Sequence, residues 1–477
     1  MSAPRRRRRP SLLLVLLAGA ASAVAQRVVV SQEVTLSDEN RYELFAGPEE
    51  SVILYRDDAK SIELEAYGPD MSRLWQRELT LDRARPSPIG ALMHEGEVNV
   101  FYTYRHDRAI HLKMHRYSAT GNLTDSMTVA RLEGDFLTAG WRLNYDEAGR
   151  YAVFTHQRDA RTWHAMGVEV ASGRLLYRET IALSGNPGVW PDEVSEPMVD
   201  HRGAVYLWTQ RNNRRSRLDE HELQIIRVDA SGRQHRLSVR LPELLLYDVE
   251  LGIDQRNDRI VLAGYYAEDP DEAAGVVAIA VPYALEGEAR VTRTPFTADV
   301  VAGVDPKDRR PTGISNLDAL DVFFRRDGAV LVIGEQRRAT VRTVGGRGGT
   351  FGTSMKTDYL YEDIVLSVTG TDGGRGDWHE VLPKKQFSQD DGAAFSSYFL
   401  AVTPRRLRLI YNDEVRSGGT VSEYRLAGNG DIERRSLMNT EYKDLWLRHE
   451  AGVQTSASTL VIPSERRNRL RLVRVDF

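Results

Sequence analysis

The chain has 477 residues, with 64 Lys and Arg against 68 Asp and Glu, a formal net charge of −4, and no cysteine. The missing thiols exclude disulfides, thiol catalysis and Cys-ligated metals, and the charge excludes a global attraction to nucleic acid or anionic lipid. A chain of this length can bury a large core without covalent cross-links.

The first 25 residues are typical of a secretory signal peptide. Arg5–Arg9 form a basic start, Leu12–Ala18 an apolar stretch, and Ala23–Ala25 a small-residue cleavage site. Because the apolar stretch is too short to cross a bilayer of roughly 30 Å, we expect cleavage before Gln26 and export to the periplasm, the cell surface or the medium. The alternative is an uncleaved N-terminal anchor. Cleavage would leave 59 basic against 68 acidic residues and no later membrane span.

A short apolar run that ends in polar residues, usually including Arg, recurs eight times. The runs are Ser51–Asp58, Val98–Asp107, Tyr151–Asp159, Ala204–Asn212, Arg259–Tyr266, Ala329–Arg338, Arg406–Glu414 and Thr459–Arg467. Strand-like repeats about fifty residues apart, without helical periodicity, are typical of a β-propeller with one four-stranded blade per repeat.

The turns inside the repeats support this assignment. A Gly-containing turn recurs between the third and fourth strands, around Gly121, Gly173, Gly232 and Gly430, and Gly supplies the positive φ that such hairpins need. The runs between turns alternate apolar and polar residues, as strands do. A large β-sandwich is the alternative fold, which a single repeating unit disfavours.

The last repeat has only three predicted strands before the chain stops at Phe477. The segment Arg27–Leu36 offers a fourth strand that would close the ring and cover the exposed edges. We therefore predict one all-β domain, residues 26–477, with eight blades, or seven if one repeat is degenerate. Two insertions, near 299–317 and 339–356, interrupt it, and the Gly and Thr content of the second predicts a mobile loop.

In a propeller, the connections after the second strands and those between blades share one face, where function most often lies. The polar ends of the eight runs should line that face. A plain alternative is that strand ends are polar because they are solvated. The residues concerned are Arg56, Arg105, Arg158, Arg211, Arg337 and Arg466, with Asp57, Asp107, Asp159 and Asp413.

The most polar predicted inter-blade loop is Pro383–Gly392. It contains candidate ligand-binding residues that could hold a sugar, a carboxylate or Ca²⁺, although Ca²⁺ needs six or more oxygens and this loop offers about four. We expect part of it to approach the polar end of the next run and form one polar cluster, as a binding site or as a structural link between blades. The candidates are Lys385, Gln386, Ser388, Asp390 and Asp391, together with Asn412 and Asp413.

The C-terminal third resembles a family of exported bacterial proteins of unknown function found in Bacteroidetes-like lineages. The likeness rests on the stretches DYLYEDIVLSVTGTDG, DWHEVLPKKQFSQDDGAAFSSY and LRLIYNDE and on the ending SASTLVIPSERRNRLRLVRVDF. It implies an exported β protein and no particular activity. The residues that match the family pattern are Lys385, Gln386, Ser388, Asp390, Ser396, Ser397, Asn412 and Asp413.

Other candidate sites carry weaker signals. His111 and His115 lie about 13 Å apart along one predicted strand, too far for one metal, and we interpret them as surface residues. Trp141, Trp190 and Trp446 precede or follow blade entries, where they could stack on sugars but more simply pack in the core.

Two function classes remain open. The leading hypothesis is a monomeric binding or scaffold module without a cofactor, which recognises a protein partner or a glycan through its loop face. This reading rests on the absence from the sequence of a nucleophile motif, a metal-ligand cluster or a cofactor fingerprint. The alternative is a glycoside hydrolase or lyase that works at the channel mouth with Asp390 or Asp391.

Overall fold

A computed structural model describes residues 27–36, 41–57, 61–82, 86–137, 140–183, 191, 193–211, 220–304, 312–345, 353–370, 378–415 and 419–477. The predicted signal peptide, residue Trp190 and the centres of both predicted insertions lie outside the described residues.

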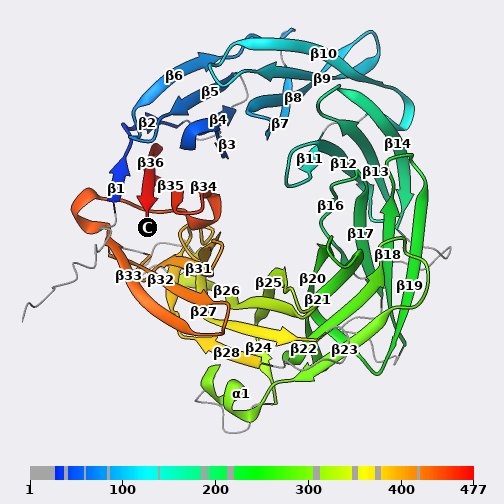
Figure 1. Ribbon diagram of the computed structural model, residues 1–477, viewed down its shortest axis with the longest axis vertical. Coiled ribbons are helices and arrows are strands. Elements are labelled where there is room, and N and C mark those ends of the chain that lie inside the picture. The colour runs from blue at the N-terminus through cyan, green and yellow to red at the C-terminus, as the bar shows by residue number, and fades with distance from the viewer. Residues whose placement is uncertain are drawn as a thin grey trace, which may run out of the picture.

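The described strands form eight antiparallel sheets that follow one another in chain order around a ring (Figure 1). Each sheet is one blade, with its first strand nearest the axis and its last at the rim. The predicted eight-bladed β-propeller is therefore confirmed.

The first four blades each take consecutive strands. They are blade 1, β3 (Arg41–Ala46), β4 (Val52–Asp57), β5 (Ile62–Tyr67) and β6 (Arg73–Glu78); blade 2, β7 (Ser87–His94), β8 (Glu97–His106), β9 (Ala109–Tyr117) and β10 (Leu123–Leu132); blade 3, β11 (Arg142–Tyr145), β12 (Tyr151–Asp159), β13 (Thr162–Glu169) and β14 (Arg174–Ala182); and blade 4, a divided inner strand β15 (Glu193–Val194) and β16 (Met198–Val199), then β17 (Val205–Arg211), β18 (Glu220–Val228) and β19 (Gln234–Pro242).

Of the other four blades, three have an additional short strand. They are blade 5, β20 (Leu245–Asp254), β21 (Arg259–Asp269), β22 (Glu272–Pro282) and β23 (Arg290–Pro295), with β24 (Ile314–Ser315) beside β22; blade 6, β25 (Leu317–Phe324), β26 (Val330–Gly345), β27 (Thr353–Thr369) and β28 (Trp378–Leu382), with β29 (Gln386–Gln389) beside β27; blade 7, β30 (Tyr398–Val402), β31 (Arg406–Asn412), β32 (Thr420–Ala427) and β33 (Ile432–Asn439); and blade 8, β34 (Val453–Ser456), β35 (Thr459–Arg466), β36 (Arg469–Asp476) and β1 (Arg27–Val30), with β2 (Val34–Thr35) also on β36.

Short helices join some of these strands. The α-helix α1 (Ala298–Val304) lies outside the ring between blades 5 and 6 (Figure 1). The 3₁₀ turns are η1 (Pro48–Glu50), η2 (Gly134–Phe136), η3 (Glu441–Lys443) and η4 (His449–Ala451). In the described part of the chain, the helices are too short and too polar to cross a membrane.

The N-terminal strand closes the ring, as the short last repeat predicts. β1 pairs antiparallel with β36, from Arg27 opposite Asp476 to Val30 opposite Val473. Between β1 and β2, Ser31 keeps the ladder satisfied, because its backbone N–H donates to Leu472 O at 2.9 Å and its hydroxyl oxygen accepts the Leu472 N–H at 2.8 Å. The final sheet thus has no unpaired edge along β36.

The core is divided among the interfaces between blades. Alternate side chains of each strand point to the preceding or the following blade, because successive residues in a strand face opposite sides. The described buried residues fall into eight apolar clusters, each built mainly from two neighbouring blades. Phe101 of blade 2 and Phe154 of blade 3, for example, are fully buried with ring centroids 5.1 Å apart.

The second predicted insertion differs from expectation at its described ends. β26 and β27 run on as a long antiparallel hairpin, still paired at Gly345 opposite Thr353, and only its tip lies outside the described residues. The prediction of a mobile loop weighed the Gly content and missed the β-branched residues of Ala339–Val344, which favour a strand.

The predicted inter-blade loop Pro383–Gly392 is also partly a strand. Its centre forms β29, which pairs with β27 from Tyr361 opposite Gln386 to Asp358 opposite Gln389. The long β27 therefore offers an edge beyond β28 that this segment fills before the chain enters blade 7.

Candidate functional site

The loop face is the face that carries the connections after second strands and between blades. The polar strand ends divide there into two groups. Arg56 and Arg337 are held by buried glutamates, Glu65 at 2.6 Å and Glu335 at 2.7 Å, and so belong to the blade framework. In contrast, Arg105 is exposed, Arg158 contacts Asp135 at 3.5 Å, Arg211 is half-buried, and Arg466 pairs with Asp444 at the surface.

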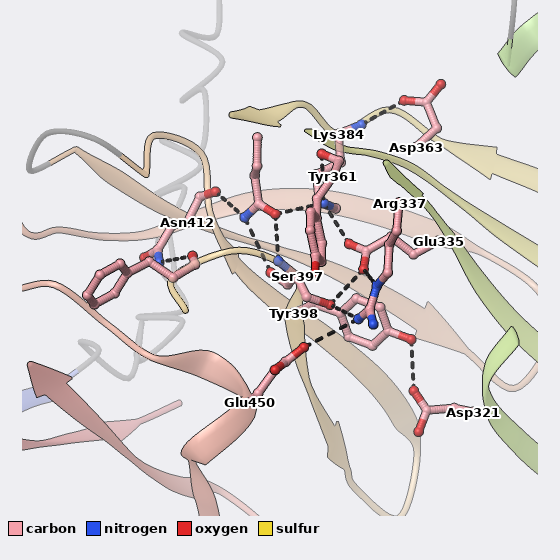
Figure 2. Close-up of polar contacts among 12 residues, drawn as sticks. Asp321, Glu335, Arg337, Tyr361, Asp363, Lys384, Ser397, Tyr398, Asn412 and Glu450 are labelled. Carbon is pink, nitrogen blue, oxygen red and sulfur yellow. Dashed lines mark hydrogen bonds and ion pairs between the residues drawn. The ribbon is translucent and has the colours of Figure 1, made fainter. Parts of the chain in front are cut away.

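Glu335, on β26, is the centre of a buried polar network between blades 6 and 7 (Figure 2). Its carboxylate is inaccessible to solvent and contacts three groups: Arg337 Nε, Lys384 Nζ and Ser397 Oγ, each at 2.7 Å. A buried charge is costly unless it is paired and hydrogen-bonded. The Glu335 carboxylate therefore holds two side chains from other segments, Lys384 and Ser397, next to Arg337 on its own strand β26.

Lys384 links this carboxylate to the walls of the network. Its ammonium donates to Gln386 Oε1 at 2.8 Å and to Tyr361 O at 3.2 Å, and its backbone N–H donates to Asp363 Oδ1 at 3.0 Å. Burial lowers the pKa of Lys384, while the Glu335 charge opposes that shift. The ammonium is thus a structural cation that solvent cannot reach.

Gln386 joins blade 6 to blade 7, and this part of the predicted cluster exists. Its amide N–H group donates to Asn412 O at 2.7 Å and Ser397 O at 3.3 Å, and its oxygen accepts the Ser397 N–H at 2.7 Å. Asn412 in turn donates to Phe395 O and to Leu447 O, both at 2.9 Å. Two side-chain amides therefore tie three consecutive blades together.

The other members of the predicted cluster bond elsewhere. Asp390 adopts a left-handed φ of 56° and accepts the Thr357 N–H at 2.7 Å, so it ends the β27–β29 ladder. Asp391 accepts the Ala393 N–H at 2.9 Å, and Asp413 contacts Arg434 Nη2 at 2.8 Å. Asp390 was expected to join Asn412 and Asp413, but its carboxylate instead accepts the backbone N–H of Thr357 on the neighbouring strand β27.

Several buried polar groups of the described residues have no hydrogen-bond partner. Near the network they include the Ser388 hydroxyl on β29, the Ser396 hydroxyl and both ring nitrogens of His449 on η4. Burial and the nearby Lys384 charge lower the pKa of His449 to about 3. His449 is therefore neutral at physiological pH. In the described residues, no group of three or more His, Asp or Glu side chains is placed to hold a metal ion.

A pocket of about 920 Å³ opens on the loop face beside this network, and we call it the loop-face pocket. A bulge shapes one wall, because Glu362 and Asp363 of β27 stand opposite the single residue Gln336 of β26. Burial raises the pKa of Asp363. The lining residues are Val304, Ser315, Asn316, Gln336, Arg337, Arg338, Glu362, Asp363, Pro383, Lys384, Lys385, Asp413, Glu414, Thr420 and Arg434.

The pocket includes two of the sequence-predicted site residues, Lys385 and Asp413. Lys385 is exposed and faces Glu362 at 3.5 Å. Arg105, Arg158 and Arg211 belong to blades 2, 3 and 4, whereas the pocket lies at blades 6 and 7. Sequence reasoning missed Glu335 and Lys384, although an acidic residue inside an apolar run, Glu335 after Gly334, is a signal of a buried ion pair.

The structure also shows where the histidines and tryptophans singled out in the sequence lie. His115 is buried rather than on the surface, and it hydrogen-bonds with the Tyr102 hydroxyl at 2.8 Å. Trp141 packs in the core between blades 2 and 3, as expected of a large aromatic. Trp446 is half-buried, edge-on to Phe395 at 5.6 Å.

Comparisons with known proteins give fold-level likeness. No protein-family model and no curated protein matches the sequence, so the family resemblance of the C-terminal third stays an expectation. Similar solved structures include a polysaccharide lyase, Uly1 (10% identity, TM-score 0.41, 94% of this chain and 99% of that chain) and the Dos1 propeller (8%, 0.45, 94% and 94%). The Nup133 propeller domain of Vanderwaltozyma polyspora is a third (8%, 0.40, 94% and 97%). The assignment of this chain as an eight-bladed β-propeller rests on its own strand pairing.

Proposed function

We propose that the protein is an exported binding module that recognises a glycan in the loop-face pocket, with a polar segment of a partner protein as the alternative ligand. The observation that supports this proposal is the pocket itself. It has a volume of about 920 Å³, its lining carries charges of both signs together with amides, and it lies against a buried ion-pair network.

The lining groups match the chemistry of a sugar. Arg338 and Lys385 are exposed donors, Glu362 and Asp363 are half-buried acceptors, and Gln336 offers both kinds of group. Sugar hydroxyls donate and accept hydrogen bonds, so a mixed lining suits them better than a lining of one sign. The network below fixes the backbone of Lys384 and Tyr361, which reduces the ordering cost of binding.

A glycan array followed by calorimetry tests the proposal. We expect Arg338→Ala and Lys385→Ala each to weaken binding of the best array ligand about 10-fold, since each removes a charged hydrogen-bond donor. Arg77→Ala, an exposed change on blade 1, is the matched control and should leave the affinity unchanged. Equal affinity in all three variants would contradict a site in this pocket.

One observation favours the enzymatic alternative at the same place. Burial raises the pKa of Asp363, which lines the pocket beside Glu362, so its carboxyl group is a candidate proton donor. Screening with chromogenic glycosides and uronate polymers tests this alternative. Asp363→Asn, which can still accept the Lys384 N–H, should abolish turnover. Loss of turnover in Asp390→Asn alone would instead restore the role that the sequence suggested for Asp390.

A further inference from the structure

A second concave surface lies on the opposite face of the ring, where the turns between first and second strands and between third and fourth strands meet. We call it the turn-face groove. It has a volume of about 760 Å³ and lies between blades 6 and 7. Its lining residues are Phe323, Phe324, Arg325, Arg326, Asp327, Leu331, Val368, Trp378, Thr403, Pro404, Arg405, Arg406, Leu407, Leu426, Ala427, Gly428, Asn429 and Gly430.

The rim of this groove is strongly basic. Arg325 and Arg326 come from the turn after β25, Arg405 from the turn after β30 and Arg406 from the start of β31; all four are exposed. Asp327, the one acidic residue among the described residues that line the groove, pairs with Arg325 at 2.8 Å. The other three arginines make no ion pair with any described residue. The groove is thus positive on a chain whose net charge is −4.

The floor of the groove is apolar and recessed. Phe323 and Trp378 are half-buried there, beside the buried Leu331 and Val368, and all four belong to the apolar cluster between blades 6 and 7. Of the large apolar residues exposed on the described surface, Leu74, Val341 and Met355 lie elsewhere, while Val402 lies at the margin of the groove, opposite Leu407 on the adjacent strand. Only a side chain or other apolar group that enters the groove can therefore reach this floor.

We propose that the turn-face groove binds a segment of a partner protein in which carboxylates flank a large apolar side chain. Guanidinium groups bind carboxylates through paired hydrogen bonds, and Arg and Trp are the residue types that most often dominate protein interfaces. Charge complementarity adds speed and specificity to such an encounter.

Two other polyanions fit the groove less well. A membrane surface needs apolar side chains that protrude, and these are recessed. Single-stranded nucleic acid needs a continuous basic track with exposed stacking faces, whereas these arginines come from two short segments beside one groove.

Fluorescence anisotropy with a labelled peptide of alternating Asp and Phe residues tests the proposal. We expect the intact protein to bind it, and the double variant Arg326→Ala/Arg405→Ala to weaken binding about 10-fold or more. Trp378→Ala should also weaken binding, and Arg77→Ala should not. A peptide with Lys in place of Asp should fail to bind. Raising the salt concentration should weaken the complex because exposed charges are screened.

Three results would overturn the proposal: no binding of the acidic peptide, binding that the double variant retains, or tighter arginine-dependent binding of phosphatidylglycerol vesicles or of a thymidine decanucleotide. The groove variants should leave glycan binding at the loop-face pocket unchanged. A failure of the peptide test therefore says nothing against the proposed function, and the reverse also holds.

Discussion

Glu335 illustrates how a single buried carboxylate can organise a whole inter-blade contact. Glu335→Ala would leave the buried Lys384 without its counter-charge and the half-buried Arg337 with only its longer contact to Glu450 at 3.4 Å. We expect the free energy of unfolding to fall by about 3–5 kcal/mol. Glu362→Ala, which breaks a contact to the exposed Lys385, should cost about 1 kcal/mol or less. Urea denaturation of both variants checks the contrast, and equal losses would contradict it.

Gln386 and Asp390 separate a link between blades from a local turn. Gln386→Ala removes bonds to Lys384, Ser397 and Asn412 and leaves their buried groups unsatisfied, which should cost about 2–4 kcal/mol. Asp390→Ala loses one bond to Thr357, for about 1 kcal/mol. Thermal and urea unfolding measure both losses. A Gln386 variant that keeps full stability but loses ligand binding would mean that this residue is a site rather than a link.

His449 predicts a pH dependence of stability. Its pKa is about 3 in the folded protein and about 6.5 in an unfolded chain. Between these two values the unfolded chain binds a proton at His449 and the folded protein does not. The free energy of unfolding therefore falls as pH drops from 6.5 towards 3, by up to ~1.4 kcal/mol per pH unit. Urea titrations at pH 5 and pH 6.5 should show a smaller difference for His449→Leu than for the natural chain. Equal differences would contradict the role of His449.

At the scale of elements, β1 and β2 give the clearest prediction. A chain that starts at residue 37 lacks the strands that cover β36, so we expect it to aggregate or to melt at a lower temperature. A chain that starts at Arg27 keeps both strands, so it is the matched control and should stay soluble. Light scattering and thermal melts compare the two. A soluble shorter chain with an unchanged melting temperature would contradict closure by β1.

Some elements could be predicted from the sequence because their signals are local. Gly173 is an example: its φ is 64°, which the turn requires, and the Ser-Gly pair in the sequence predicts such a turn. The β26–β27 hairpin and β29 were missed because Gly and polar residues there outweigh the strand propensity locally. Their pairing comes from the length of β27, which offers an edge that only the folded blade reveals.

The candidate site was harder to predict for the same reason. The prediction that Gln386 and Asn412 lie close together was correct, because the order of the blades places their two segments side by side. Glu335 was not, because Ser397, one of its partners, lies 62 residues further along the chain. A pattern of local polarity identifies the face on which a site lies, but the contact between two particular side chains depends on how far neighbouring blades are twisted and staggered.

At the scale of the whole molecule, the eight interfaces share one closed ring. Phe154→Ala opens a cavity between blades 2 and 3 and should cost about 3–5 kcal/mol. Because each blade packs against two neighbours, we expect the loss to lower one common transition instead of releasing a single blade. Circular dichroism and tryptophan fluorescence should give superimposable melting curves. Two separate transitions would contradict this cooperativity.

The pairing of β1 with β36 also sets the order in which the ring can form. Ser31 and Leu472 are 441 positions apart, so β1 must wait for β36 before blade 8 can close. Such a contact has a very high contact order, and its closing step is slow compared with pairing inside a blade. Until β36 is in place, β1 and the open side of blade 1 stay available to other chains. We therefore expect the nascent protein to depend on a holding chaperone for longer than its individual blades would.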